Sequence, residues 1–159
     1  MVLSQEELLK VLEPLREKRK IVFTNGCFDL LHAGHAHYLR KAKELGDLLV
    51  VGLNSDESVR RIKGPRRPIL PQSLRAYLLD SLKPVDYVVI FEEDTPEKLI
   101  KAVRPQVLVK GADWEVENIV GADFVLSYGG EVRRVEFEFE LSTSWIIKRI
   151  IELYRDAER

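Results

Sequence analysis

A strand, a tight loop and a helix follow one another in residues 20–38, and this stretch constrains the fold more than any other. Ile21-Val22-Phe23 is a short apolar run of β-forming residues, typical of a buried strand. Thr24-Asn25-Gly26 ends that run with turn-forming residues. Small and apolar residues then recur at helical spacing, at Ala33, Ala36, Leu39 and Ala42. Such a junction places free backbone N–H groups and a positive helix end at the carboxyl edge of a sheet, where anions bind.

Two histidines lie at this helix start, in the sequence His32-Ala33-Gly34-His35. Two imidazoles three residues apart, with a glycine between them, can converge on one phosphate. The chain has 3 histidines, and two of them fall in this turn. We therefore interpret the pair as phosphate ligands and not as ordinary surface or core residues. His37 lies further into the helix, and we interpret it as a packing or solvent-exposed residue.

The composition is typical of a single globular domain. A chain of 159 residues with 45% hydrophobic and 32% charged residues can bury a sizeable core. No apolar run approaches the roughly 20 residues of a membrane span, and the amino terminus lacks a secretory-signal pattern. The single cysteine, Cys27, excludes an internal disulfide, so we expect a cytoplasmic protein. A net charge of -1 gives no bulk attraction to nucleic acid or anionic membranes.

The rest of the chain predicts alternating strands and helices. We expect residues 1–19 to form an amphipathic helix, capped by Ser4 and Glu7 and kinked or shortened at Pro14, that packs on a domain of residues 20–159. Further strands are predicted at residues 47–53, 85–91, 105–110 and 131–135. Helices are predicted at residues 33–45, 55–62, 71–82, 96–103, 120–127 and 141–151. The last helix should turn four isoleucines toward the core: Ile146, Ile147, Ile150 and Ile151. The alternation predicts an α/β fold with a five-stranded parallel sheet flanked by helices.

The first motif, T-N-G-C-F-D-L-L-H-A-G-H at residues 24–35, resembles that of the HxGH nucleotidyltransferases, in their cytidylyltransferase-like branch. The residues of this motif are most similar to those of the heptose 1-phosphate adenylyltransferases of lipopolysaccharide-core synthesis, including the adenylyltransferase domain of the bifunctional heptose enzyme. V-K-G-A-D-W at residues 109–114 resembles the V-K-G-G-D-Y of that group, and F-E-E-D-T-P at residues 91–96 matches it almost letter for letter. The resemblance covers residues 20–151 and implies a Rossmann-like nucleotidyltransferase fold.

The resemblance also implies a set of site residues. His32, His35 and Lys63 would be catalytic, with Lys63 on a mobile basic loop at residues 60–68 that covers the nucleotide phosphates. Nucleotide binding would fall to Thr24, Asn25, Gly26, Phe28, Gly34, Gly111, Asp113, Trp114, Ser142 and Thr143. Asp29 and Arg75 would bind the acceptor substrate. No residue is implied as a metal ligand, since Mg²⁺ would bridge phosphate oxygens and keep several waters.

Three of the polar or aromatic features allow a second interpretation. Trp114 can be a core aromatic instead of a base contact. Glu92-Glu93-Asp94 has the composition of a metal cluster, but Thr95-Pro96 follows as an expected N-cap and first helical residue, and acids beside a helix start suit its dipole. Cys27 can be a packing residue or a reactive thiol.

The expected activity is transfer of AMP from ATP to a sugar 1-phosphate, with Mg²⁺, without a protein nucleophile. A phosphate monoester has its second pKa near ~6, so the acceptor is already largely a dianion, and catalysis needs positioning and preorganised donors. The alternatives are a glycerol-3-phosphate cytidylyltransferase, an FMN adenylyltransferase, and a nucleotide-binding regulatory module without turnover. The first is disfavoured because residues 136–141 lack the arginine that precedes its serine-threonine motif. We expect a homodimer.

Overall fold

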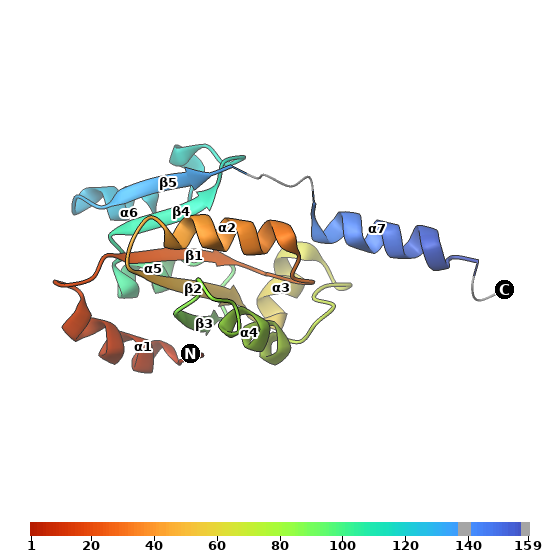
Figure 1. Ribbon diagram of the computed structural model, residues 1–159, viewed down its shortest axis with the longest axis horizontal. Helices are drawn as coiled ribbons and strands as arrows, with labels where there is room; N and C mark the ends of the chain where they lie inside the picture. Colours follow the sequence, from red (N-terminus) through yellow and green to blue (C-terminus); the bar gives the residue numbers. More distant parts are fainter. Residues whose placement is uncertain (137–140, 157–159) are drawn as a thin grey trace.

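A five-stranded parallel sheet crosses the centre of the computed structural model, which describes residues 1–136 and 141–156 (Figure 1). The strand order is β3-β2-β1-β4-β5. The strands are β1 (Ile21–Gly26), β2 (Leu48–Asn54), β3 (Tyr87–Phe91), β4 (Val107–Gly111) and β5 (Glu131–Val135). All four pairings are parallel, as the sequence predicts.

Continuous hydrophobicity in the central strands reflects burial on both faces of the sheet. Ile21, Val22 and Phe23 of β1 are each 0% exposed. Successive side chains of a strand point to opposite faces, and accordingly Ile21 and Phe23 pack in one core cluster while Val22 packs in the other. A strand with only one buried face would alternate apolar and polar residues.

Helices cover both faces of the sheet. One face packs against α1 (Gln5–Leu12), α5 (Glu97–Val103) and α6 (Ala122–Ser127), and the other against α2 (Ala33–Lys43) and α4 (Gln72–Asp80). Apart from the last helix, α7 (Thr143–Tyr154), the remaining elements are α3 (Asp56–Lys63), which follows β2, and two short 3₁₀ turns, η1 (Glu13–Leu15) and η2 (Val116–Asn118). Among the described residues, no helix is long and apolar enough to cross a membrane.

The crevice for a ligand is set by the strand order. β1 lies between β2 and β4, and the helices that follow β1 and β4 cover opposite faces of the sheet. In open parallel sheets ligands bind at such a switch point, outside the carboxyl ends of the strands. The loop that carries the two histidines therefore lies at the edge where a ligand is expected.

The ends of two helices test the sequence predictions in detail. The Ser4–Glu7 capping box is present, and α1 gives way at Glu13 to the 3₁₀ turn that contains Pro14, so the predicted shortening is confirmed. The predicted N-cap of α5 is wrong by one residue. Pro96 occupies the cap position with a φ of -81° and a ψ of 11°, and Thr95 makes no capping hydrogen bond.

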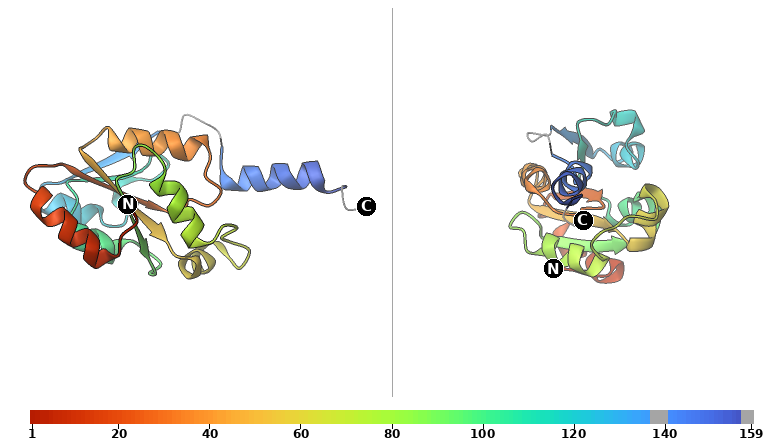
Figure 2. Two further views of the ribbon diagram at one scale, coloured as in Figure 1. Left: turned by 60° about the horizontal axis from the view of Figure 1, so that its bottom comes forward. Right: turned by 90° about the vertical axis from the view of Figure 1, so that its right-hand side faces the viewer.

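The prediction that the last helix packs on the core is wrong. α7 (Thr143–Tyr154) extends away from the sheet in Figure 1 and in the left view of Figure 2, and it has no buried residue. Ile150 and Ile151 remain 48% and 50% exposed. Helical periodicity specifies an apolar face, but it does not specify what covers that face.

Candidate functional site

Two adjoining cavities open at the carboxyl ends of β1 and β4. The α3-side chamber, about 500 Å³, is lined by Asn54, Lys63 and Arg67 among others. The α2-side chamber, about 630 Å³, is lined by His32, Gly34, Gly111 and Asp113 among others. Residues that line both chambers form a shared wall: Asn25, Gly26, Cys27, Phe28, His35, Lys110, Trp114, Ser142 and Thr143.

The two predicted histidines form a stacked pair at the start of α2. His32 is the N-cap residue, and its Nδ1 accepts hydrogen bonds from the backbone N–H groups of Gly34 (3.0 Å) and His35 (3.4 Å). In return, the backbone N–H of His32 donates to Nδ1 of His35 at 3.3 Å. The ring centroids are 3.8 Å apart with an interplanar angle of 24°. The imidazoles thus replace the usual hydroxyl and carboxylate of a capping box.

These hydrogen bonds assign the tautomer of both rings. A neutral imidazole has one donor and one acceptor nitrogen, and the backbone bonds require Nδ1 to be the acceptor in each. The proton must then be on Nε2. Each ring therefore offers an N–H donor at its outer nitrogen, beside the positive end of α2.

Burial keeps the pair neutral. It lowers the pKa of His35 to about 4, with the neighbouring His32 contributing in the same direction and Asp29 opposing. Burial also lowers the pKa of His32. At neutral pH both rings are uncharged hydrogen-bond donors, an arrangement that binds an anionic oxygen without needing a separate proton transfer.

Gly34 is required by the close approach of the His32 ring. A Cβ built at Gly34 would lie 2.8 Å from Cε1 and 3.0 Å from Nδ1 of His32. Since such distances are shorter than real Cβ contacts, any larger residue would displace the capping imidazole. The glycine in the motif therefore shapes the histidine pair, and its N–H also helps to hold it.

Asp29 fixes the loop after β1 to distant segments. Its carboxylate is 3% exposed and accepts hydrogen bonds from the backbone N–H groups of Ile69 (2.8 Å) and Leu70 (3.0 Å). The hydroxyl of Thr143 donates to the backbone carbonyl oxygen of Asp29. Although Asp29 lines the α3-side chamber, both carboxylate oxygens are engaged, so it acts on the site by holding the loop in place.

Arg75 was expected to bind substrate, but its geometry gives it a positioning role. The side chain is 0% exposed and lines neither chamber. The guanidinium donates to the carbonyl oxygens of Cys27 (2.6 Å), Asn54 (2.9 Å) and Leu70 (2.9 Å) and pairs with the carboxylate of Asp56 (2.8 Å). It thereby joins the carboxyl ends of β1 and β2 to the segment before α4.

Thr24 has a similar role. It is 0% exposed, and its hydroxyl contacts Tyr38 Oη (2.8 Å) and donates to the carbonyl of Val109 (3.1 Å). It therefore lies behind the shared wall and ties β1 to β4 and α2. The other predicted nucleotide-binding residues line one chamber or both.

The predicted basic loop is partly helical. Lys63 is the last residue of α3, capped by Gly64 with a φ of 105°, and its exposed side chain lines the α3-side chamber. Arg67, which the sequence analysis did not single out, also lines this chamber and donates to the hydroxyl of Ser144 at 3.1 Å. Arg66 lines neither chamber.

The segment after β4 closes the other side of the site. Trp114 is 45% exposed and lines both chambers, so it is not a core residue. The ammonium of Lys110 lies 5.4 Å from the centroid of its indole. Lys110 and Cys27 are site residues that the predicted set omitted; for Lys110, the signal was a lysine ending an otherwise apolar strand.

The described carboxylates near the site lie apart from one another. Among the described residues, no group of three or more histidine, cysteine, aspartate or glutamate side chains could hold an ion. Asp94 pairs with Arg61 at 2.6 Å, which fits the structural interpretation of the acidic cluster. Asp113 lines the α2-side chamber.

Replacement of Arg75 by methionine should reduce the free energy of unfolding by about 3–5 kcal/mol. The substitution strands the Asp56 carboxylate and three carbonyl groups that the guanidinium now satisfies. Urea unfolding measures the loss, with exposed Arg66→Met as the matched control. A loss below 1 kcal/mol would contradict the positioning role.

The lowered pKa of His35 predicts a pH-dependent stability. The unfolded chain binds a proton near pH 6.5 and the folded chain near pH 4, so acid favours unfolding in this window. The contribution of neutral His35 to the free energy of unfolding is complete above pH 6.5 and falls by up to about 3 kcal/mol as the pH drops to 4. Urea unfolding of the native chain and of His35→Gln between these pH values isolates the effect. If the free energy of unfolding had the same pH dependence in both proteins, the predicted effect of His35 would be refuted.

Comparison with known proteins agrees with this geometry. A model of the cytidylyltransferase-like family matches residues 23–149. The bifunctional protein HldE of Trichlorobacter lovleyi is 52% identical over 156 residues, covering 98% of this chain and 32% of the relative. HldE of Helicobacter pylori strain Shi470 is 58% identical over 149 residues, covering 94% of this chain and 31% of the relative. The chain thus spans about a third of the length of these curated relatives.

Solved structures show the same fold. The lipopolysaccharide core biosynthesis protein from Thermoplasma volcanium is 32% identical, with a TM-score of 0.60 over 76% of this chain and 97% of that one. A pantoate-beta-alanine ligase from Francisella tularensis is 17% identical, with a TM-score of 0.67 over 100% of this chain and 79% of that one, a likeness that shows the fold alone. From the family match and the histidine-bearing crevice together, we conclude that this chain belongs to the cytidylyltransferase-like family.

Proposed function

We propose that this chain transfers AMP from ATP to D-glycero-β-D-manno-heptose 1-phosphate, giving ADP-heptose and pyrophosphate for lipopolysaccharide-core synthesis. The observation that carries the proposal is the pair of neutral imidazoles at the start of α2, between two chambers. The motif sequences support the heptose acceptor, and the similarity to the Thermoplasma volcanium structure, a lipopolysaccharide core biosynthesis protein, supports the pathway. ATP and Mg²⁺ are available in the cytoplasm, and a single free cysteine suits that compartment, where we place the protein.

The two chambers suit the two substrates. The α2-side chamber, with Gly111, Asp113 and Trp114 along its rim, suits the adenosine, because backbone groups and an indole face can read and stack a base. The α3-side chamber, with Lys63 and Arg67, suits the sugar phosphate. The α-phosphate would then lie at the shared wall beside His35.

The chemistry needs no protein base. An oxygen of the acceptor phosphate attacks the α-phosphorus of ATP, a new P–O bond forms, the bond to the β-phosphate breaks, and pyrophosphate leaves. The Nε2–H groups of His32 and His35 would donate to the oxygens that gain charge. Lys63 would close over the phosphates from α3. α7 begins after the Ser142 cap, whose hydroxyl accepts from the N–H of Trp145. The N–H groups of Thr143 and Ser144 at the same helix end would donate to the leaving pyrophosphate.

A panel of ATP and CTP against heptose 1-phosphate, glycerol 3-phosphate and FMN tests the proposed activity. We expect pyrophosphate release to be fastest with ATP and heptose 1-phosphate, because a buried polar group left unpaired by the wrong base costs about 1–3 kcal/mol. Lys63→Ala should lower kcat by at least 10-fold, while Arg66→Ala, the control outside both chambers, should not. Preference for CTP would assign the chain to the cytidylyltransferases, and no turnover with any pair would favour a regulatory nucleotide-binding module.

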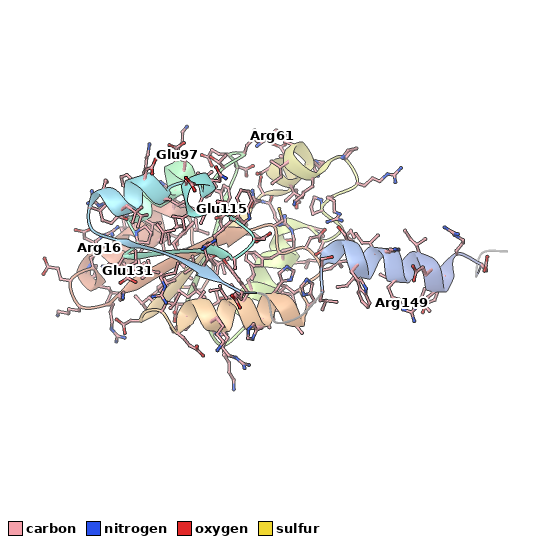
Figure 3. All side chains as sticks on the ribbon, turned by 90° about the horizontal axis from the view of Figure 1, so that it is seen from above. Arg16, Arg61, Glu97, Glu115, Glu131 and Arg149 are labelled. Carbon is pink, nitrogen blue, oxygen red and sulfur yellow. The ribbon has the colours of Figure 1, made fainter. Side chains whose placement is uncertain are left out.

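The exposed face of α7 suggests the partner that the sequence leads us to expect, a second copy of the chain. Ile146, Ile150 and Tyr154 are spaced along one stripe of the helix, and most of this stripe is exposed. If two α7 helices pair antiparallel about Ile150, the apolar stripes of the two copies face each other, as in a two-fold dimer. Figure 3 shows Arg149 on this helix, away from the sheet.

A charge placed in this stripe should therefore dissociate the dimer. We expect the native chain to sediment as a dimer and Ile150→Glu to sediment as a monomer. Leu126→Glu on α6, at a residue that is likewise 50% exposed, is the matched control and should remain dimeric. Sedimentation velocity distinguishes the two states. A native chain that sediments as a monomer would rule out the proposed assembly.

A further inference from the structure

We propose that Lys110 is a substrate-binding residue that contacts both reacting phosphates, the α-phosphate of ATP and the phosphate of the acceptor, where the two chambers meet. The inference rests on the proposed function and adds to it a cation supplied by the sheet. Neither the histidine motif nor the basic segment at residues 60–68 contains this residue.

The position of Lys110 follows from the sheet. It is the penultimate residue of β4, which lies next to β1, and these two strands flank the switch point. The three preceding residues, Val107, Leu108 and Val109, are buried, and Lys110 interrupts this apolar run as the strand reaches its carboxyl end. Its side chain lines both chambers. A cation at this point faces ligands on either side.

The charge of Lys110 is poorly compensated by protein groups. Among the described residues, its ammonium has no ion pair with a carboxylate, and it makes a cation–π interaction with the ring of Trp114. The groups that influence it are Cys27, Asp113 and Lys63, and burial lowers its pKa. A half-buried cation without an anion is costly, and a phosphate in either chamber would supply the missing partner.

A cation is needed at this place for a physical reason. The reaction brings two polyanions together, and their mutual repulsion is strongest in a partly desolvated site. The histidine pair is neutral and donates hydrogen bonds without adding charge. Lys63 approaches from the solvent-exposed end of α3. Lys110 is the lysine of the shared wall, so it can offset charge on both reactants while they are in contact.

The competing explanation is that Lys110 only supports the Trp114 ring. Methionine is close to lysine in length and stays apolar, so Lys110→Met removes the charge while filling the same space. Lys110→Arg keeps the charge. If the residue only packed against the indole, Lys110→Met would leave kcat and the pH profile unchanged.

The test compares Lys110→Met and Lys110→Arg with Lys98→Met, an exposed lysine on α5, using ATP and heptose 1-phosphate. We expect Lys110→Met to lower kcat/KM for the acceptor by about 10- to 100-fold, as for loss of a hydrogen bond to a charged group. Its melting temperature should be no lower than that of the native chain, because the substitution removes an unpaired, half-buried charge. Activity of the native enzyme should fall at alkaline pH as Lys110 loses its proton. In Lys110→Arg the alkaline limb of the pH–activity profile should move to higher pH. Activity of Lys110→Met within 3-fold of native would overturn the proposal.

A binding measurement distinguishes failure of the Lys110 proposal from failure of the proposed function. Calorimetric titration with the α,β-methylene analogue of ATP and Mg²⁺ requires no acceptor. If the native chain binds the analogue but does not use heptose 1-phosphate, the proposed function fails. In that case about 10-fold weaker binding by Lys110→Met still supports its phosphate contact, and equal binding overturns it.

Discussion

Backbone N–H groups at the start of α2 hold the two imidazoles, and the chemistry of the site depends on these bonds. They occupy Nδ1 of both rings and so leave the proton on Nε2. In many sites a carboxylate orients a histidine and raises its basicity. Here the orienting groups are uncharged donors, and burial lowers both pKa values. The result is a pair of neutral donors, which suits a reaction whose acceptor is already ionised.

The donors are useful only if the loop before α2 is held rigidly. Phe28 and Leu30 have φ values of 47° and 53°, a left-handed conformation that is uncommon for residues with side chains. Asp29 between them binds the segment before α4 through two backbone N–H groups. Arg75, fully buried, collects carbonyl groups from the ends of β1 and β2. The energetic cost of burying this charge is thus linked to the geometry of the proposed phosphate site.

Much of the fold could be predicted because its signals are local. Apolar runs such as Leu49–Leu53 and caps such as Ser4 specify their own elements, and a parallel sheet follows from their alternation. The inward orientation of the Arg75 side chain could not be predicted, since its partners are carbonyl groups that only the folded sheet brings near. The exposed face of α7 is a similar case, because an isoleucine stripe has the same pattern whether it faces a core or a second chain. In the sequence, Lys110 is a lysine near the end of an apolar run, and its place on the wall shared by both chambers follows from the pairing of β4 with β1.

The protonation state of the imidazoles tests the central claim most directly. Long-range ¹H–¹⁵N correlation spectra report which ring nitrogen carries the proton. At pH 7 the account predicts that His32 and His35 are neutral with the proton on Nε2, and that addition of ATP and Mg²⁺ shifts both Nε2–H signals downfield as each donates to a phosphate oxygen. A proton on Nδ1 in either ring, or an imidazolium in the free protein, would contradict it.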